Sequence, residues 1–237
     1  LIGASIEVIV SCDDEPMWRH TTVPSSLTAF QNGSQCSECK LGRPSLAGFS
    51  QKVTACTLAK AAGVRYLVDD GFLAPNDLAV AADGRVYFTD PPHHPPPPEP
   101  VGRVMVLERD GTVTVFADGF HYCNGIAFTP TGEVVVVEGR GLLRVAADGT
   151  RDWVIEELGP GGGDGFCLDV DGRYYVASTS EHGVRVVEPD GSVVDFLEIL
   201  GEGLTTNCCF GGPDMRTLFA TDALPGTVVA WEGMPTP

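Results

Sequence analysis

The chain has 237 residues, 43 % of them hydrophobic, so it can bury a sizeable core and is not composed like a disordered protein. Its formal net charge of −17 argues against nucleic acid or an anionic membrane surface as a partner, since both attract clustered Lys and Arg. The 29 glycines and 18 prolines suit many short strands joined by turns better than a helical fold.

No apolar run reaches the length of a transmembrane helix. The opening residues 1–10 are too short for a signal peptide and lack its basic start, so we expect a cytoplasmic protein. We expect the eight cysteines to be reduced, because Cys36 and Cys39 form one CxxC pair with no second pair at zinc-ligand spacing. The excess of acidic over basic residues either raises the local concentration of cations or simply forms a solvated acidic surface.

A sequence unit recurs along the chain: an Asn or Asp leads an apolar run, a tight turn follows, and a second β-rich run closes the unit. Its four lead residues stand 48, 40 and 43 positions apart: Asn76, Asn124, Asp164 and Asn207. A second unit, with an Asp-Gly turn between β-rich runs, lies between the copies at 105–116, 143–154 and 184–196. Each period therefore holds four short strands, which predicts the blades of an all-β propeller.

The pattern degrades before Asn76. Residues 52–68 look like the outer half of another blade, which gives roughly five blades, the first of them poorly formed. We expect Ile6 to Val10 to supply the outer strand of the last blade, beside Val228 to Trp231. The prediction is a single propeller domain over 1–237, with 1–62 divergent or incomplete and 63–237 well matched.

The first strand of every blade lines the central channel of a propeller, so the four lead residues should lie at one end of it. Carboxylate and amide oxygens gathered there would suit a hard cation such as Ca²⁺, whereas Zn²⁺ usually takes His or Cys. The alternative is that each Asn or Asp only caps a turn through local hydrogen bonds.

The loop after Asp90, residues 91–100, should lie at the channel mouth, where its prolines favour a stiff rim or lid. His93 and His94 in that loop, and His121 on the same face, could assist catalysis or be exposed spectators. Glu138 ends a second strand and is expected to hydrogen-bond within the channel instead of binding metal.

Four stretches carry a family resemblance, and their order and spacing are specific: Pro75-Asn-Asp-Leu-Ala-Val with Tyr87-Phe-Thr-Asp-Pro91, Asn124-Gly-Ile-Ala-Phe, Asp164-Gly-Phe, and Thr206-Asn-Cys-Cys-Phe-Gly-Gly212. They resemble the family of gluconolactonases, regucalcin (senescence marker protein) and luciferin-regenerating enzyme. The resemblance implies a six-bladed propeller with one divalent cation in the channel, commonly opening small lactones. It implies Ca²⁺, or another divalent cation such as Zn²⁺, Mg²⁺ or Mn²⁺.

Carried over by motif, Asn124 and Asp164 resemble metal ligands, and Asp164 resembles the catalytic acid/base. Asn76 resembles the residue that contacts substrate, and we place His93, His121 and Asn207 beside it around the substrate. The family's remaining ligand is a Glu in an E-G-P-x-W motif, for which Asp13-Asp14-Glu15-Pro16-Met17-Trp18 stands here. Either Asp14 or Glu15 fits that ligand position.

The chain departs from the family pattern in two places. Little of a first blade follows Trp18, and Ala74 stands where some sugar lactonases carry Arg. The implied chemistry is cation-polarised attack of water on the lactone carbonyl, with Asp164 accepting a proton. The alternatives are a non-catalytic, metal-stapled binding module and a strictosidine-synthase-like propeller with a catalytic Glu. No G-x-S-x-G elbow supports a serine hydrolase.

Overall fold

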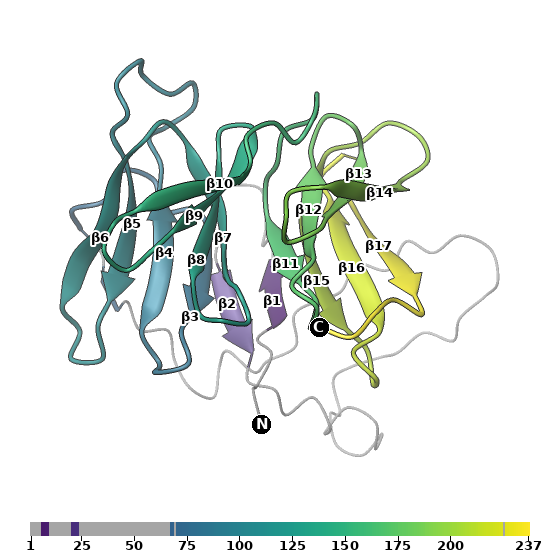
Figure 1. Ribbon diagram of the computed structural model, residues 1–237, viewed down its shortest axis with the longest axis horizontal. Helices are drawn as coiled ribbons and strands as arrows, with labels where there is room; N and C mark the ends of the chain where they lie inside the picture. Colours follow the sequence, from purple (N-terminus) through teal and green to yellow (C-terminus); the bar gives the residue numbers. More distant parts are fainter. Residues whose placement is uncertain (1–5, 10–19, 24–66, 69, 225) are drawn as a thin grey trace, which may run out of the picture. The chain divides into compact units, whose positions relative to one another are not determined.

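A computed structural model describes residues 67–68, 70–224 and 226–237, together with the backbone of two short strands nearer the N-terminus (Figure 1). The chain divides into two compact units, Leu1–Leu67 and Val68–Pro237. In the first unit, β1 (Ile6–Ile9) pairs antiparallel with β2 (His20–Val23). The predicted pairing with the last blade is therefore wrong for Ile6–Ile9, which pair with β2 in a two-stranded sheet, and Val10 lies outside the described residues.

The second unit is built from antiparallel sheets whose strands follow one another in chain order, three with four strands and one with three. Blade one holds β3 (Leu78–Val80), β4 (Val86–Asp90), β5 (Gly102–Leu107) and β6 (Val113–Phe120). Blade two holds β7 (Cys123–Phe128), β8 (Val134–Glu138), β9 (Gly141–Val145) and β10 (Arg151–Ile155). Blade three holds β11 (Phe166–Leu168), β12 (Tyr174–Ser178), β13 (Gly183–Val187) and β14 (Val193–Glu198). Blade four holds β15 (Thr205–Gly211), β16 (Thr217–Asp222) and β17 (Thr227–Glu232).

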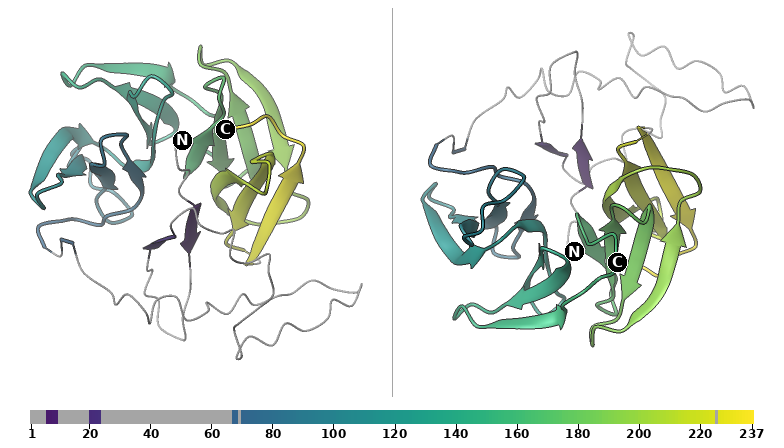
Figure 2. Two further views of the ribbon diagram at one scale, coloured as in Figure 1. Left: turned by 90° about the horizontal axis from the view of Figure 1, so that it is seen from below. Right: turned by 90° about the horizontal axis from the view of Figure 1, so that it is seen from above.

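These four blades fan around a common axis in the second unit, as the end-on views of Figure 2 show. Their first strands lie innermost, because β3 contacts β7, β7 contacts β11, and β11 contacts β15. The all-β, propeller-like fold is confirmed. The described residues form four blades where the family resemblance implied six. The strands expected within 52–66 lie outside the described residues, and the single domain predicted over 1–237 stays a prediction.

The Asp-Gly turns between strands form as the sequence predicts. Gly84, Gly111, Gly149 and Gly191 have φ between 84° and 89°, a left-handed conformation that side chains with a Cβ rarely adopt. Each preceding Asp accepts the amide of the residue after the glycine, as in Thr112 N to Asp110 Oδ1 at 2.9 Å. The turn chemistry therefore fixes where each hairpin reverses.

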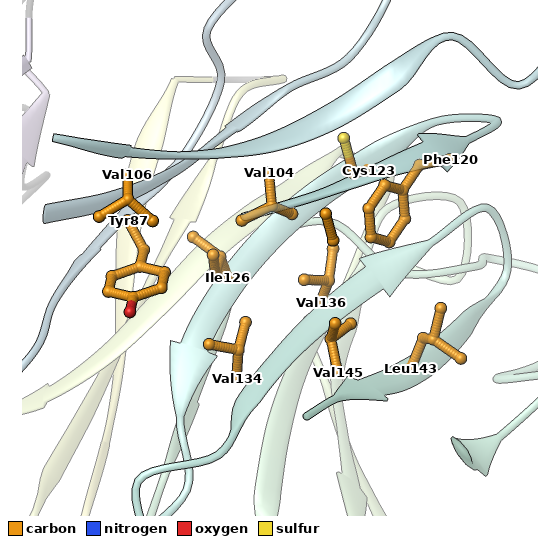
Figure 3. Packing of buried hydrophobic residues seen from close by; sticks show 11 residues of the cluster. Tyr87, Val104, Val106, Phe120, Cys123, Ile126, Val134, Val136, Leu143 and Val145 are labelled. Carbon is orange, nitrogen blue, oxygen red and sulfur yellow. The ribbon is translucent and has the colours of Figure 1, made fainter. Parts of the chain in front are cut away.

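The hydrophobic core lies between neighbouring blades, because alternate residues of each strand face the adjacent sheet. Between blades one and two, Val104 and Val106 pack against Ile126, Val134 and Val136 (Figure 3). Two equivalent clusters join blade two to three and blade three to four. Burial of each valine contributes about 1.5–3 kcal/mol relative to exposure, so the blades stabilise one another face to face.

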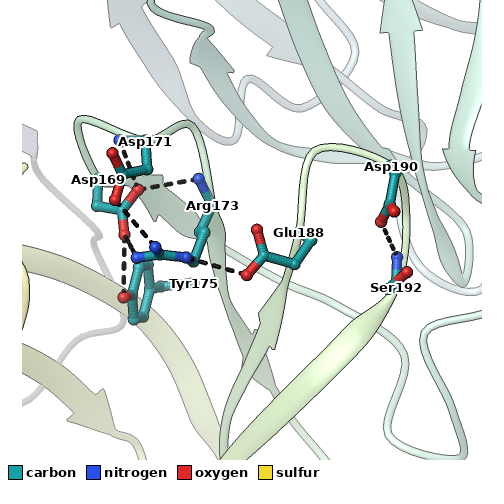
Figure 4. Close-up of polar contacts among 7 residues, drawn as sticks. All are labelled: Asp169, Asp171, Arg173, Tyr175, Glu188, Asp190 and Ser192. Carbon is teal, nitrogen blue, oxygen red and sulfur yellow. Dashed lines mark hydrogen bonds and ion pairs between the residues drawn. The ribbon is translucent and has the colours of Figure 1, made fainter.

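A polar network closes the β11–β12 hairpin (Figure 4). It follows the last residue of β11, whereas Asp164 precedes the first. Asp169 is buried and accepts hydrogen bonds from Arg173 Nη1 at 2.8 Å and from the Tyr175 hydroxyl at 3.2 Å. Arg173 also bonds Glu188 at 3.0 Å. This buried carboxylate is satisfied by its neighbours and stabilises the hairpin.

Among the described residues, no helix is long and apolar enough to span a membrane.

Candidate functional site

All four lead residues stand where the innermost strand of their blade becomes irregular. The register between β7 and β8 shifts across Asn124, and the register between β15 and β16 shifts just before Asn207. In the other two blades, regular pairing begins two residues after Asn76 and after Asp164. Such irregularities re-aim side chains at the ends of strands. Each lead residue therefore either precedes or interrupts the regular pairing of its strand.

The backbones of blades two, three and four approach closely at these positions. Gly125 donates its amide to Asp164 O at 3.2 Å, and Gly165 donates to Thr206 O at 2.9 Å. A Cβ at Gly125 would lie 2.3 Å from Asp164 O, and a Cβ at Gly165 would lie 2.3 Å from Asn207 Cγ. A side chain at either position would force its neighbours to move. These two glycines let the lead residues of three successive blades lie side by side.

The carboxylate of Asp164 is the most strongly perturbed acid in this group. Burial first, and the nearby carboxylate of Asp77 second, raise the pKa of Asp164 to about 7. A hydrogen bond from the Asn124 side chain acts in the opposite direction and lowers that pKa. Desolvation therefore dominates, and the site disfavours an uncompensated negative charge on Asp164.

Asn124 carries a buried oxygen whose hydrogen-bonding capacity is unused. Within the described part of the chain, Asn124 Oδ1 is buried without a hydrogen-bond partner, although buried polar atoms are normally paired. A hard cation would be coordinated by both this oxygen and the Asp164 carboxylate. Its positive charge would offset the free-energy cost of removing the carboxylate charge from water. Asn124 and Asp164 therefore fit the divalent cation that the sequence predicts.

The donors are amide and carboxylate oxygens rather than a dense group of charged ligands. No three His, Cys, Asp or Glu side chains cluster to hold a metal among the residues that the structure describes. Asp14 and Glu15, the two candidates for a further ligand, lie outside the described residues. Asn76 is half-buried and donates its backbone amide to Thr89 O at 3.0 Å.

Asp77 is a site residue that the sequence analysis missed. Its Oδ2 accepts the amide of Ile126 in blade two at 3.0 Å, and its Oδ1 accepts the amide of Leu78 at 2.9 Å. The carboxylate thus joins blade one to blade two only two residues from Asn124. A signal was present in the sequence, since Asp77 follows its lead residue where the next two copies have Gly125 and Gly165.

Aromatic rings stand at the predicted channel mouth. Burial, followed by the charge of Asp164, raises the pKa of Tyr122, which places the phenol near that carboxylate. The ring of His94 meets the ring of Tyr122 edge-on, with centroids 5.7 Å apart. His93, His94 and His121 are all exposed. Of the rim histidines, His94 is therefore the one with a described ring contact to a neighbour of Asp164.

Carboxylates at the ends of second strands organise the backbone that leads into the site. Glu138 accepts the amides of His121 and Tyr122 at 2.6 and 3.3 Å, in agreement with the expected hydrogen-bonding role. Asp90 accepts the amides of Leu73 and Ala74 at 2.8 and 2.9 Å. Glu138 thus holds the segment that leads into the first strand of blade two, and Asp90 holds the segment that leads into the first strand of blade one.

Comparison with known proteins gives a family match over most of the chain. The family described as SMP-30/Gluconolactonase/LRE-like region matches residues 46–223. Regucalcin of Xenopus laevis is 34 % identical over 70 residues, which are 29 % of this chain and 23 % of that protein.

Several solved structures share the fold. A gluconolactonase from Xanthomonas campestris has a TM-score of 0.56 and 30 % identity, over 69 % of this chain and 57 % of its own. A calcium-binding protein, regucalcin, from Agrobacterium tumefaciens has a TM-score of 0.55 and 25 % identity, over 62 % and 52 %. A luciferin-regenerating enzyme has a TM-score of 0.56 and 19 % identity, over 63 % and 53 %. The matched region spans a little over half the length of these structures.

Proposed function

Since this chain belongs to the SMP-30/gluconolactonase/LRE-like family, we propose that it opens lactones by metal-dependent hydrolysis. The observation that carries the proposal is the pairing of an orphaned, buried Asn124 Oδ1 with the half-buried carboxylate of Asp164, whose pKa desolvation raises. Oxygen atoms arranged in this way are costly without a cation and become ligands with one. Calcium-binding and gluconolactonase relatives support the same interpretation.

Asn124 and Asp164 would hold the cation, and Asp14 or Glu15 would complete the ligand set. We propose Ca²⁺, with Zn²⁺, Mg²⁺ and Mn²⁺ as the other candidates. When bound, such an ion supplies Lewis-acid polarisation of the lactone carbonyl, which stabilises developing negative charge by several kcal/mol.

Asp164 is the residue we propose as acid/base. Its carboxylate orients a water for attack on the carbonyl carbon and takes the proton that the water loses. Its neighbours hold it in place: Gly125 bonds its carbonyl oxygen, and the Asn124 side chain bonds its carboxylate. General-base catalysis of this kind accelerates a reaction by about 10²–10⁴-fold.

The substrate is proposed to be a small lactone bound against the channel mouth, with Asn76 and Asn207 as its polar contacts. His93 and His121 remain candidates for the rim of that site, and His94 and Tyr122 add an aromatic wall to it. Ala74 presents a methyl group where some sugar lactonases carry Arg. We therefore do not expect recognition of a sugar lactone through an arginine at that position.

Acid release from a panel of lactones, with added Ca²⁺ and with chelator, tests the proposal. Asp164→Asn should lower kcat/KM by about 100-fold or more, while Asp152→Asn, a surface exchange of the same type, should leave it unchanged. Hydrolysis that ignores chelator would contradict the metal-dependent mechanism. Equal activity of Asp164→Asn and the wild type would remove Asp164 from the acid/base role.

A non-catalytic propeller in which the cation only staples the channel is the second candidate. The similarity to a solved structure described as a calcium-binding protein, regucalcin, supports this candidate. In that case Ca²⁺ would raise the Tm of the wild type and not of Asp164→Asn, and no lactone would be hydrolysed. The two candidates are thus separated by measuring thermal stability and turnover on the same samples.

A further inference from the structure

Two cysteines that the proposed mechanism does not use face each other between blades three and four. Cys167 lies on β11 and Cys208 on β15, and their sulfur atoms are 3.9 Å apart. Both are free thiols in this structure. The residues are 41 positions apart in sequence, so the contact is created by the docking of one blade on the next.

The register of the two inner strands explains why these thiols meet. Gly165 donates its amide to Thr206 O at 2.9 Å, which fixes β11 beside β15. Two residues further along each strand, the side chains of Cys167 and Cys208 reach the same hydrophobic cluster. Because side chains repeat their direction every second residue, the backbone bond and the thiol pair belong to one register.

We propose that Cys167 and Cys208 are a site of reversible oxidation, at which a disulfide locks blade three to blade four. An S–S bond is about 2.05 Å long, so the two sulfur atoms have to close by about 2 Å. We expect rotation of both side chains to supply that movement. The hydrogen bond that the Cys208 S–H donates to Tyr175 O, at 3.0 Å, is lost when the disulfide forms.

A hydroperoxide is the two-electron oxidant that converts the two thiols into a disulfide. The Cys167 sulfur gives up its proton and attacks one oxygen of the hydroperoxide; the O–O bond breaks, Cys167 becomes a sulfenic acid, and the other oxygen leaves with that proton as water or an alcohol. The Cys208 sulfur then displaces hydroxide from the Cys167 sulfur, the S–S bond forms, and the hydroxide leaves as water with the Cys208 proton. Cys167 is half-buried and Cys208 is buried, so Cys167 is the thiol that meets the oxidant and Cys208 is the one that resolves it.

The environment of the pair sets how readily it reacts. Burial first, and the neighbouring Cys208 second, raise the pKa of Cys167, so at neutral pH Cys167 is held as a thiol. Sustained oxidant is therefore required, and dithiothreitol should reverse the product. Asp164 precedes Cys167 by three residues and Asn207 precedes Cys208, so the bond would restrain both strands that carry these side chains.

Peptide mapping of the wild-type protein tests this directly. The protein is incubated with hydrogen peroxide, the remaining thiols are alkylated, and the trypsin digest is analysed without reductant. The expected product joins peptide 152–173, which holds Cys167, to peptide 186–216, which holds Cys208 and Cys209. Cys123, whose thiol is buried beside Arg103 O in another blade, serves as an internal control and should be recovered alkylated after unfolding.

Two variants identify the partner. The cross-linked peptide should persist in Cys209→Ser and disappear in Cys208→Ser, and the oxidised wild type should gain about 5 °C in Tm, reversed by dithiothreitol. Persistence of the cross-link in Cys208→Ser would assign it to Cys209 and overturn the proposal. Its absence from the wild type, at a peroxide dose that oxidises methionine in the same digest, would overturn it as well.

Discussion

The imidazole of His182 is held between two hydrogen-bond acceptors, with Nε2 at 2.9 Å from Asp222 Oδ2 and Nδ1 at 3.1 Å from Gly201 O. Only the imidazolium form donates from both ring nitrogens. His182 and Asp222 are both buried and join blade three to blade four. A Cβ at Gly203 would lie 2.1 Å from His182 Nε2, so glycine at that position permits the contact.

This pair predicts that stability falls as pH rises above the neutral range. The hydrogen bond to Asp222 is the largest influence raising the pKa of His182, and the charge of Glu198 acts in the same direction. A histidine with a raised folded-state pKa stabilises fully below its unfolded value, 6.5, and loses that contribution as pH rises through the folded value. Unfolding in urea at pH 6 and pH 8.5 measures the loss.

His182→Asn is the matched variant, because Asn tolerates the left-handed backbone that His182 adopts at φ 59°. It should lose about 1.5–3 kcal/mol at pH 6, the range for a hydrogen bond to a charged group, and should show less change between pH 6 and pH 8.5. An unaltered pH slope in this variant would show that the imidazole is not the group responsible.

The blade repeat and its turns could be predicted from sequence because both are local. An Asp-Gly pair such as Asp110-Gly111 reverses the chain through its own backbone conformation, which no distant residue has to supply. The spacing of Asn124 and Asp164 then predicted their common place in neighbouring blades. The residue types indicated the chemistry of the site, and the spacing of the repeat indicated where its residues lie in the blades.

The contacts between blades could not be predicted in the same way, because they pair residues that no local pattern relates. Asp77 bonds the amide of Ile126, 49 residues away, and His182 meets Asp222, 40 residues away. The strand at 6–9 shows the same limit, since a short β-rich run does not specify which partner it takes. Long-range pairing depends on how the sheets dock, and a single sequence does not state it.

Asp164 should destabilise the cation-free protein at neutral pH. Its folded-state pKa, about 7, is raised above the value of 3.8 expected for the unfolded chain. Between these values the unfolded state releases a proton that the folded state keeps, so stability falls as pH rises from about 4 to 7 and the loss is complete above 7. The loss amounts to about 4 kcal/mol, at 1.36 kcal/mol for each pKa unit.

Asp164→Asn removes that titration. In chelator at pH 8, urea unfolding should show the variant more stable than the wild type by a few kcal/mol, with the difference vanishing near pH 4. Added Ca²⁺ should reverse the order, because the cation stabilises only the chain that keeps its carboxylate. A variant less stable than the wild type in chelator at pH 8 would contradict the burial cost assigned to Asp164.

Gly165→Ala should displace Asn207. The new methyl group would lie 2.3 Å from both Asn207 Cγ and Oδ1, so the amide has to move or the blades have to separate. We expect a loss of about 1–3 kcal/mol in unfolding free energy, the usual cost of overpacking. Adding Asn207→Ala to the variant should recover part of it, because the truncated side chain leaves room for the methyl group. Equal stability of the single and double variants would exclude this clash as the cause.

Asp77→Asn should lower the pKa of Asp164. The charge of Asp77 raises that pKa, and the side-chain amide introduced by the substitution keeps one oxygen for the Ile126 amide while removing the charge. The pH midpoint of the stability loss in chelator, or the carboxyl ¹³C shift of Asp164, measures the change. Asp195→Asn is the control, because Asp195 accepts the amide of its own successor, Phe196, at 2.8 Å just as Asp77 accepts that of Leu78, yet it is exposed on β14. The midpoint should move in Asp77→Asn alone. If it moves equally in both variants, the shift reflects net charge, and the carboxylate of Asp77 has no particular influence on Asp164.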